Sequence, residues 1–287
     1  MLQQKTIHLK KIFLVILLLL CLPIFSAENI TSKQIMEKMF AAIQNLQTAR
    51  YTLTISERIK GVNHNAISEV KLNANPRKLY IKNPVNGTEI LWVQGENKGN
   101  AWVYPNGFPY ATLNLSPTGD IMRKNQHHTL QDLGFIYIAK IVKNSIFKTS
   151  EPFEKVFIYI GEINWEGVDC YKVFANFSDF KYVNYKVEKG ETISSVSAEF
   201  NCGEYRILEK NTWINDYNQY IEGKTISIPN NYSAKTLVYV NKKNLLPVFL
   251  KVYDDQGFYE GYEYRDLRAN VPIADEEFRK DYKDYKF

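Results

Sequence analysis

Residues 235–264 read KTLVYVNKKNLLPVFLKVYDDQGFYEGYEY. Three segments in this stretch, 235–240, 247–253 and 258–264, are rich in Val, Leu, Phe and Tyr. They are separated by the polar residues 241–244 and by Asp254-Asp-Gln-Gly257. Aromatic and β-branched segments bounded by Asn, Asp and Gly predict strands joined by turns. We therefore expect an antiparallel sheet at this end of the chain.

The first half of the chain repeats this pattern. Tyr51, Leu53 and Ile55 alternate with polar residues, as in a strand with one buried face. Asn86-Gly87 is a strong hairpin signal between residues 78–82 and 89–93. Further strand patterns occupy residues 66–73, 101–104, 155–160 and 170–174. The fold class expected is mainly β (α+β), with a curved antiparallel half-open barrel.

Two segments have helical rather than strand periodicity. Apolar residues recur at helical spacing in 33–47, after the capping candidates Thr31 and Ser32. They recur again in 128–146, after Thr129. We expect one or both helices to cover the concave face of the sheet.

The N-terminus has the composition of an export signal. Lys5, Lys10 and Lys11 precede the apolar residues 12–25, which end at Ser26-Ala27. This order is typical of a secretory signal peptide over 1–27. An uncleaved anchor, or lipid attachment at Cys21, is the alternative. We expect export to the periplasm or cell envelope.

Composition excludes some classes of protein. A net charge of +5 is spread along the chain without a basic cluster, which argues against nucleic-acid binding. Only Cys170 and Cys202 remain after a cleaved signal, so disulfides cannot replace an apolar core. Tyr and Phe are abundant, at 20 and 16 residues, and suit strands with one wet face or surfaces that stack on sugars.

Residues 185–232 interrupt the strand pattern with a small unit of their own. Tyr185 and Val187 alternate as a short strand, and Gly190 turns the chain. Thr192 stands where a helix cap is expected, before a first short helix, and a second helix follows. A closing strand ends at Pro229. The order is strand, helix, helix, strand.

This unit resembles a LysM domain. The matching residues follow in order over the usual span: Tyr185, Val187, Gly190, Glu191, Thr192, Ile193, Ala198, Asn211, Gly223, Ile226, Ile228 and Pro229. The sequence departs from the family at Cys202 and in the long aromatic stretch 212–220. The resemblance implies an inserted LysM module over 184–232 within a host domain of residues 28–183 and 233–287.

The resemblance also implies binding of N-acetylglucosamine glycan, as in peptidoglycan. The two walls of the groove would be formed by Gly190, Glu191, Thr192 and Ile193 and by Asn211, Ile221, Glu222 and Gly223. Backbone groups at a glycine turn suit the N-acetyl amide, and Ile193 suits its methyl. The alternative is that Gly190 and Thr192 only make a turn and a helix cap.

The host residues resemble the LolA/LolB-type carrier fold. The resemblance rests on the leading helix and strand of residues 42–56, on residues 239–247, on 253–257 and on Asp275-Glu-Glu-Phe278. It implies a concave apolar face that holds an acyl lipid or lipoprotein. The candidate cavity residues are Leu91, Val93, Trp102 and Tyr104, with the helix at 128–146 as a lid. A packed core without ligand is the alternative.

Catalytic and metal patterns are weak in this sequence. Cys170 lies within an alternating strand, with no helix N-terminus to activate it. His127 and His128 are adjacent and point apart, so we expect them on the surface at a helix start, not as metal ligands. We expect no enzyme activity, catalytic residue, cofactor or metal. A wall-modifying enzyme targeted by LysM, or a pure scaffold, is the alternative.

Overall fold

The computed structural model describes residues 30–148 and 151–287. The expected signal peptide lies outside these residues. In the described part of the chain, eleven strands form one antiparallel sheet in the order β6-β5-β4-β3-β2-β1-β13-β12-β11-β8-β7. Its edge strands, β6 and β7, do not pair with each other, so the sheet is open. The mainly antiparallel, half-open fold expected from the sequence is confirmed.

The strands of this sheet come from both ends of the chain. Their bounds are β1 Thr48–Ile59, β2 Val62–Asn73, β3 Lys78–Lys82, β4 Glu89–Val93, β5 Ala101–Tyr104, β6 Leu113–Leu115, β7 Phe157–Trp165, β8 Val168–Asn176, β11 Lys235–Asn241, β12 Pro247–Asp254 and β13 Gly257–Ala269. β11, β12 and β13 are the three strands expected in residues 235–264. β1 pairs with β13 in antiparallel register, with Leu53 opposite Tyr264 and Glu57 opposite Glu260. This pairing joins the N-terminal meander to the C-terminal one.

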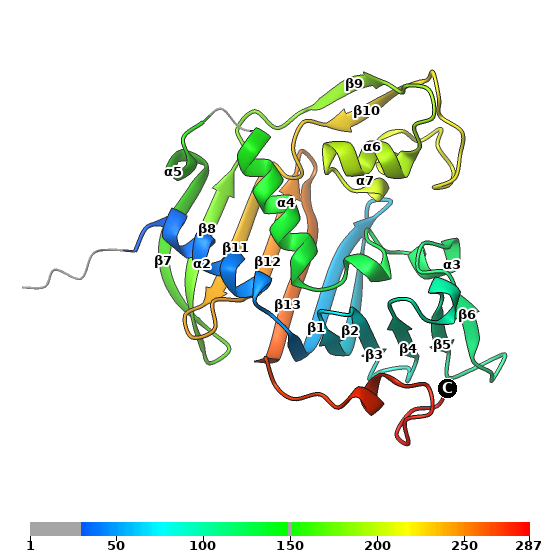
Figure 1. Cartoon of the computed structure of the whole chain (residues 1–287). Coiled ribbons are helices and arrows are strands. Elements are labelled where there is room, and N and C mark those ends of the chain that lie inside the picture. Colours follow the sequence, from blue (N-terminus) through cyan, green and yellow to red (C-terminus); the bar gives the residue numbers. More distant parts are fainter. Residues whose placement is uncertain (1–29, 149–150) are drawn as a thin grey trace, which may run out of the picture. The chain divides into compact units, whose positions relative to one another are not determined.

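Two helices, α2 and α4, cross one face of the sheet (Figure 1). α2 spans Ser32–Gln44, and Thr31, one of the two capping candidates, caps it by accepting a hydrogen bond from the Gln34 amide. α4 spans Phe135–Lys148, so the helix expected at 128–146 begins later than predicted. A separate 3-10 turn, η2 (Leu130–Asp132), precedes it instead, and Gly134, with φ of +107°, lies between this turn and α4.

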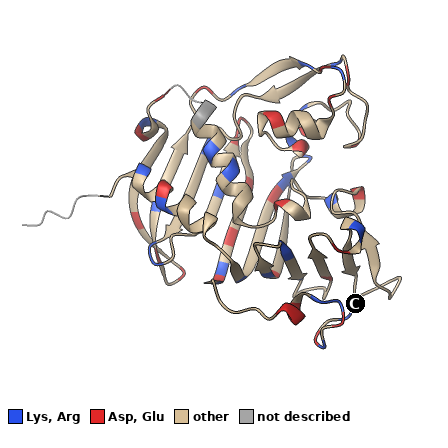
Figure 2. Cartoon of the chain, viewed as in Figure 1, with Lys and Arg blue, Asp and Glu red and all other residues tan. Residues whose placement is uncertain are grey.

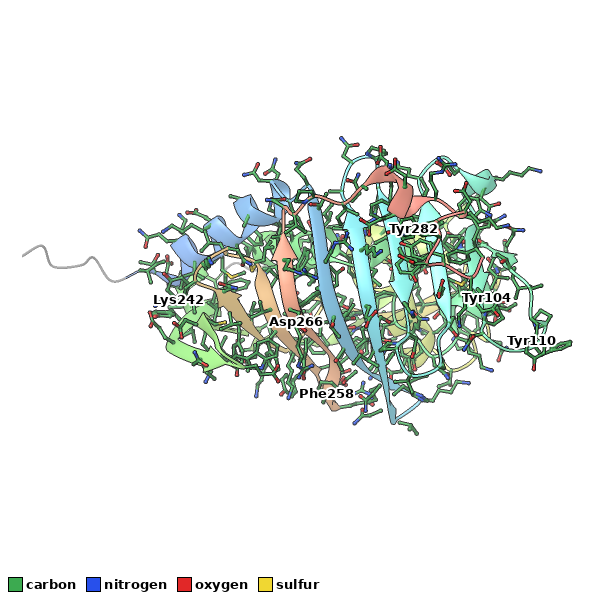
Figure 3. All side chains as sticks on the ribbon, turned by 90° about the horizontal axis from the view of Figure 1, so that it is seen from below. Tyr104, Tyr110, Lys242, Phe258, Asp266 and Tyr282 are labelled. Carbon is green, nitrogen blue, oxygen red and sulfur yellow. The ribbon has the colours of Figure 1, made fainter. Side chains whose placement is uncertain are left out.

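Shorter helical segments connect the strands. They are η1 Asn97–Gly99, α3 Asp120–Arg123, α5 Phe153–Val156 and η3 Asp275–Phe278. The loop before β6 carries Tyr110, which is 76% exposed and stands away from the rest of the chain (Figure 3). Every helix among the described residues is too short or too polar to span a lipid bilayer.

Residues 182–229 form a second, two-stranded sheet with two helices beside it. The elements are β9 Tyr182–Lys186, α6 Ile193–Phe200, α7 Glu204–Lys210 and β10 Thr225–Pro229. Thr192 caps α6, as predicted. The unit has its own core, which includes Val187, Ile193, Ile207 and Ile226. Residues 31–287, this unit included, group as one compact body.

The C-terminal residues cover the other face of the sheet, over β3, β4 and β5. Phe278, Tyr285 and Phe287 pack against Tyr80 and Leu91. The rings of Tyr80 and Tyr285 stack with centroids 3.8 Å apart. Basic and acidic residues are interspersed over the described residues in the view of Figure 2.

Candidate functional site

A cavity of about 380 Å³ lies between the sheet and the helices α2 and α4. Its walls follow the alternation of the strands, because every second residue of a strand points to the same face. β1 contributes Leu53 and Ile55, β8 contributes Val173, and β12 contributes Leu250. Further apolar lining residues are Met36, Ile81, Ile90, Ile138 and Ile141. The cavity is therefore mainly apolar.

One region of the wall is polar, and its residues are bonded to one another. Glu57 of β1 and Glu260 of β13 lie side by side in register. Oε2 of Glu260 is 2.8 Å from Nδ1 of His127 and 3.0 Å from Nε2 of His128. The side chains of both Glu260 and His127 are almost fully buried. The same alternation that lines the cavity with apolar residues therefore places two carboxylates at its wall.

Two tyrosines complete this polar group. The hydroxyl of Tyr262 lies 3.2 Å from Oε1 of Glu57 and 3.2 Å from Oε2 of Glu260. The hydroxyl of Tyr232 lies 3.1 Å from Nε2 of His128 and donates a hydrogen bond to Oε1 of Glu260. Glu57, His128, Tyr232, Glu260 and Tyr262 all line the cavity. We call them, with His127, the polar cluster.

Opposite charges within the polar cluster change the protonation of its members. Burial alone would lower the pKa of His128, but the charge and hydrogen bond of Glu260 raise it to about 9. Burial alone would raise the pKa of Glu260, but the two histidines hold it well below its usual range. The pair is therefore a buried, charged hydrogen bond at neutral pH.

The surface position expected for the two histidines is wrong. His127 is only 5% exposed, and its ring stacks between Tyr205 and Tyr259, with centroids 4.7 and 4.1 Å away. The prediction assumed that two adjacent histidines at a helix start point apart. Residues 124–129 are not helical, and both rings reach Glu260. One feature of the sequence could have indicated this site. Glu260 lies on the same strand face as Tyr262 and Tyr264, and a charged residue is unusual on a face that is buried.

The residues predicted to line a lipid cavity do not line it. Leu91 and Val93 pack against Phe278, and Trp102 packs against the same cluster. Tyr104 lies beneath Lys286, with Nζ 5.8 Å from the ring centroid. All four face the C-terminal residues, because the face of β4 that lines the cavity is the one carrying Ile90. The prediction chose the wrong face of these strands.

The helix expected as a lid does lie over the cavity, since Ile138 and Ile141 of α4 line it.

The residues predicted for glycan binding divide into two groups. Ile193 and Ile221 are buried in the core of their unit, so neither can contact a sugar. Asn211 is also buried, and its side chain bonds the backbone of Ile207 and Ser227. These three assignments are corrected to structural roles. Thr192 caps α6 with its side chain.

The other four predicted glycan residues meet at two adjacent loops. The amide of Gly190 donates to Oε2 of Glu222, 2.9 Å away. Glu191 accepts a hydrogen bond from the hydroxyl of Tyr185, and the amide of Gly223 donates to the carbonyl of Val187. The turn after β9 and the loop before β10 therefore lie side by side.

Cys170 has the properties of a structural thiol. It is fully buried on β8. Burial, with a smaller contribution from Asp169, raises its pKa to about 11. A thiol that stays protonated at neutral pH is a poor nucleophile.

A family described as "Protein of unknown function (DUF1571)" matches residues 47–181. The match spans β1 to β8 and contains Glu57, His127 and His128, whereas Glu260 lies outside it. No curated protein matches this chain.

Several solved structures are similar to this chain. A DUF1329 family protein from Desulfovibrio piger is 12% identical, with a TM-score of 0.34 over 87% of this chain and 98% of that one. Lipoprotein LppX from Mycobacterium tuberculosis is 12% identical, with a TM-score of 0.39 over 85% and 97%. A LolA superfamily protein from Nitrosomonas europaea is 13% identical, with a TM-score of 0.33 over 88% and 99%.

Proposed function

We propose that this protein is an exported, non-enzymatic binding protein of the cell envelope that holds an acyl lipid, or the acyl chain of a lipoprotein, in the cavity beneath α4. The observation that carries this proposal is an apolar cavity with a polar cluster in one region of its wall. An acyl lipid matches this arrangement, because its chain is apolar and its end forms hydrogen bonds. The volume of about 380 Å³ falls within the range of about 300–1,000 Å³ typical of small-molecule sites.

The energetics of such a complex are reasonable. A dissociation constant near 1 µM corresponds to about 8 kcal/mol. Burial of about 300 Å² of acyl surface provides a free energy of that size. Tyr232, Tyr262 and His128 offer hydrogen-bonding groups for the polar end of the ligand at the cavity wall.

Cavity filling tests this proposal. Ile141→Trp adds bulk on the cavity side of α4, while Ile136→Trp makes the same change on the same helix at a residue that is 53% exposed and does not line the cavity. We expect the protein to bind a fluorescent fatty-acid probe at micromolar concentration. Ile141→Trp should weaken binding at least about tenfold, and Ile136→Trp should not. Bare protein in native mass spectrometry, together with no probe binding, contradicts the proposal.

A second proposal is binding of peptidoglycan N-acetylglucosamine by the LysM-like unit. It rests on the resemblance of residues 185–232 and on the contact between Gly190 and Glu222, which brings the two predicted loops together. Trp213 and Tyr220, in the stretch between α7 and β10, are 42% and 71% exposed. Exposed aromatic rings of this kind stack on sugars.

Sedimentation with purified insoluble peptidoglycan tests the second proposal. The double variant Trp213→Ala/Tyr220→Ala should remain in the supernatant, because it loses both exposed rings. Tyr110→Ala removes a comparably exposed ring from the sheet domain and should still sediment. If all three proteins distribute alike, the LysM-like unit does not bind the wall through these rings.

A further inference from the structure

Four side chains of the polar cluster bring atoms that can bind a metal close together. Glu57, His127, His128 and Glu260 each offer one oxygen or nitrogen atom, and these atoms all lie within 4.8 Å of one another. They come from β1, from the loop before η2 and from β13, so only the tertiary structure brings them together. Imidazole nitrogens with carboxylate oxygens form a donor set that first-row divalent metals accept.

The ring of His127 is oriented as metal-bound histidines are. Its Nε2 lies 2.9 Å from the carbonyl oxygen of Arg58. A carbonyl only accepts, so Nε2 carries the hydrogen and Nδ1 faces the oxygen of Glu260. Histidine ligands of metals generally donate their second ring nitrogen to a backbone carbonyl or a carboxylate. Stacking between Tyr205 and Tyr259 holds the ring in this orientation.

The carboxylates are also held by neighbours. The hydroxyl of Tyr262 lies within hydrogen-bond distance of Glu57 and of Glu260 and can donate to either one, and Tyr232 donates to Glu260. Hydrogen bonds to ligating carboxylates are the usual outer support of a metal site.

The charge of the site calls for a cation. Glu57 is 4% exposed and Glu260 is 1% exposed, and they are neighbours across β1 and β13. Two buried carboxylates at this distance need positive charge beside them. The nearby guanidinium groups of Arg58 and Arg206 are directed to Asp254 instead. Without a metal, the ring of His128, with Nε2 3.0 Å from Oε2 of Glu260, is the cation beside this pair and balances only one of the two carboxylates. A divalent ion between the four side chains would take the place of the His128 proton and neutralise both carboxylates.

We propose that Glu57, His127, His128 and Glu260 form a binding site for a divalent first-row transition metal of the zinc class. Zinc accepts nitrogen and oxygen ligands at about 2.0–2.2 Å in a tetrahedral arrangement. Because Glu57, His128 and Glu260 line the cavity, the ion lies at the cavity wall. The ion would share the polar cluster with the polar end of an acyl ligand, but zinc binding is measured without any lipid, so the two proposals can fail separately.

Metal stoichiometry and affinity test the site. Purified protein is treated with a chelator, dialysed, and titrated with Zn²⁺, with elemental analysis of the bound fraction and Co²⁺ absorption as a second readout. We expect one ion per chain and a Co²⁺ spectrum without thiolate charge-transfer bands, because none of the four ligands is a cysteine. Glu260→Gln and His128→Gln should weaken binding by more than about 100-fold. Tyr262→Phe, which removes only an outer hydrogen bond, should weaken it about 10–100-fold.

Glu263→Gln is the matched control. Glu263 lies on the same strand, three residues on and so on the opposite face, where it pairs with Arg265. This variant should bind zinc as the unaltered protein does. Circular dichroism checks that each variant is folded, and His127 is left unchanged because its stacked ring supports the core. The proposal is overturned if the unaltered protein binds no ion at micromolar Zn²⁺. It is equally overturned if folded Glu260→Gln and His128→Gln bind zinc as tightly as Glu263→Gln.

Discussion

Nη1 of Arg206, on α7, lies 3.2 Å from Oδ2 of Asp254, at the end of β12, and both side chains are almost completely buried. The same oxygen lies 2.6 Å from Nη2 of Arg58 on β1. The guanidinium of Arg206 also lies 3.5 Å above the ring of Tyr259. One buried carboxylate thus joins the unit of residues 182–229 to two strands of the main sheet.

Asp254→Asn should strongly destabilise the protein. The substitution leaves Arg58 and Arg206 buried without their shared counter-charge, which typically costs about 3–5 kcal/mol. Urea unfolding at neutral pH measures the loss. Asp255→Asn removes a neighbouring carboxylate that is exposed, so it should change the free energy of unfolding by less than about 1 kcal/mol. Equal stability of the two variants would show that the buried pair has no net effect.

Excision of residues 182–229 should leave the main sheet folded. The ends of the segment already meet, because the amide of Asn230 donates to the carbonyl of Lys181 at 2.9 Å. A short Gly-Ser linker can therefore close the gap. We expect a cooperative thermal transition with a lowered midpoint, since Asp254 loses Arg206 and His127 loses the stacked ring of Tyr205. Loss of cooperativity in thermal circular dichroism would mean that the unit belongs to the core of the sheet domain.

Glu277 should make the attachment of the C-terminal residues pH-dependent. Burial alone would raise the pKa of Glu277, but hydrogen bonds from Arg50 and Lys71, with their charges, lower it from 4.5 to about 2. A lowered folded-state pKa means that the stabilisation is complete above about pH 4.5 and is lost as the pH falls toward 2. Glu277→Gln should therefore cost about 1–2 kcal/mol at pH 7 and almost nothing at pH 2.

Urea unfolding at several pH values measures this difference. Glu276→Gln, at the exposed neighbouring residue, is the control and should follow the unaltered protein throughout. A constant difference between Glu277→Gln and the unaltered protein from pH 7 to pH 2 would show that the ion pairs do not stabilise the fold.

Cys170 should react slowly with iodoacetamide in the folded protein. Its pKa is raised from 9.0 to about 11, which lowers the thiolate fraction about 100-fold, and burial blocks access as well. Peptide mass spectrometry of samples labelled with and without urea gives the rate at this residue. Labelling of the folded protein as fast as the unfolded one would contradict a buried structural thiol.

The strands and the covering helices were predictable from the sequence, because both depend on short-range periodicity. Residues 235–264 form β11, β12 and β13, and Thr31 and Thr192 cap the helices that follow them. In these segments, local hydrogen bonding and the burial of one face favour the same structure.

Two features depend on the tertiary structure: which face of β4 lines the cavity, and the assembly of the candidate metal site. The alternation in β4 separates Ile90 from Leu91 and Val93, but both sets are apolar, so the pattern does not tell which one faces the cavity. The C-terminal residues cover Leu91 and Val93, and this contact between distant segments leaves Ile90 to line the cavity. Glu57, His128 and Glu260 are likewise far apart in the chain. The pairing of β1 with β13 brings Glu57 and Glu260 together, because a strand register is set by contacts across the whole sheet and not by neighbours in the sequence. The loop before η2 then places His128 against Glu260.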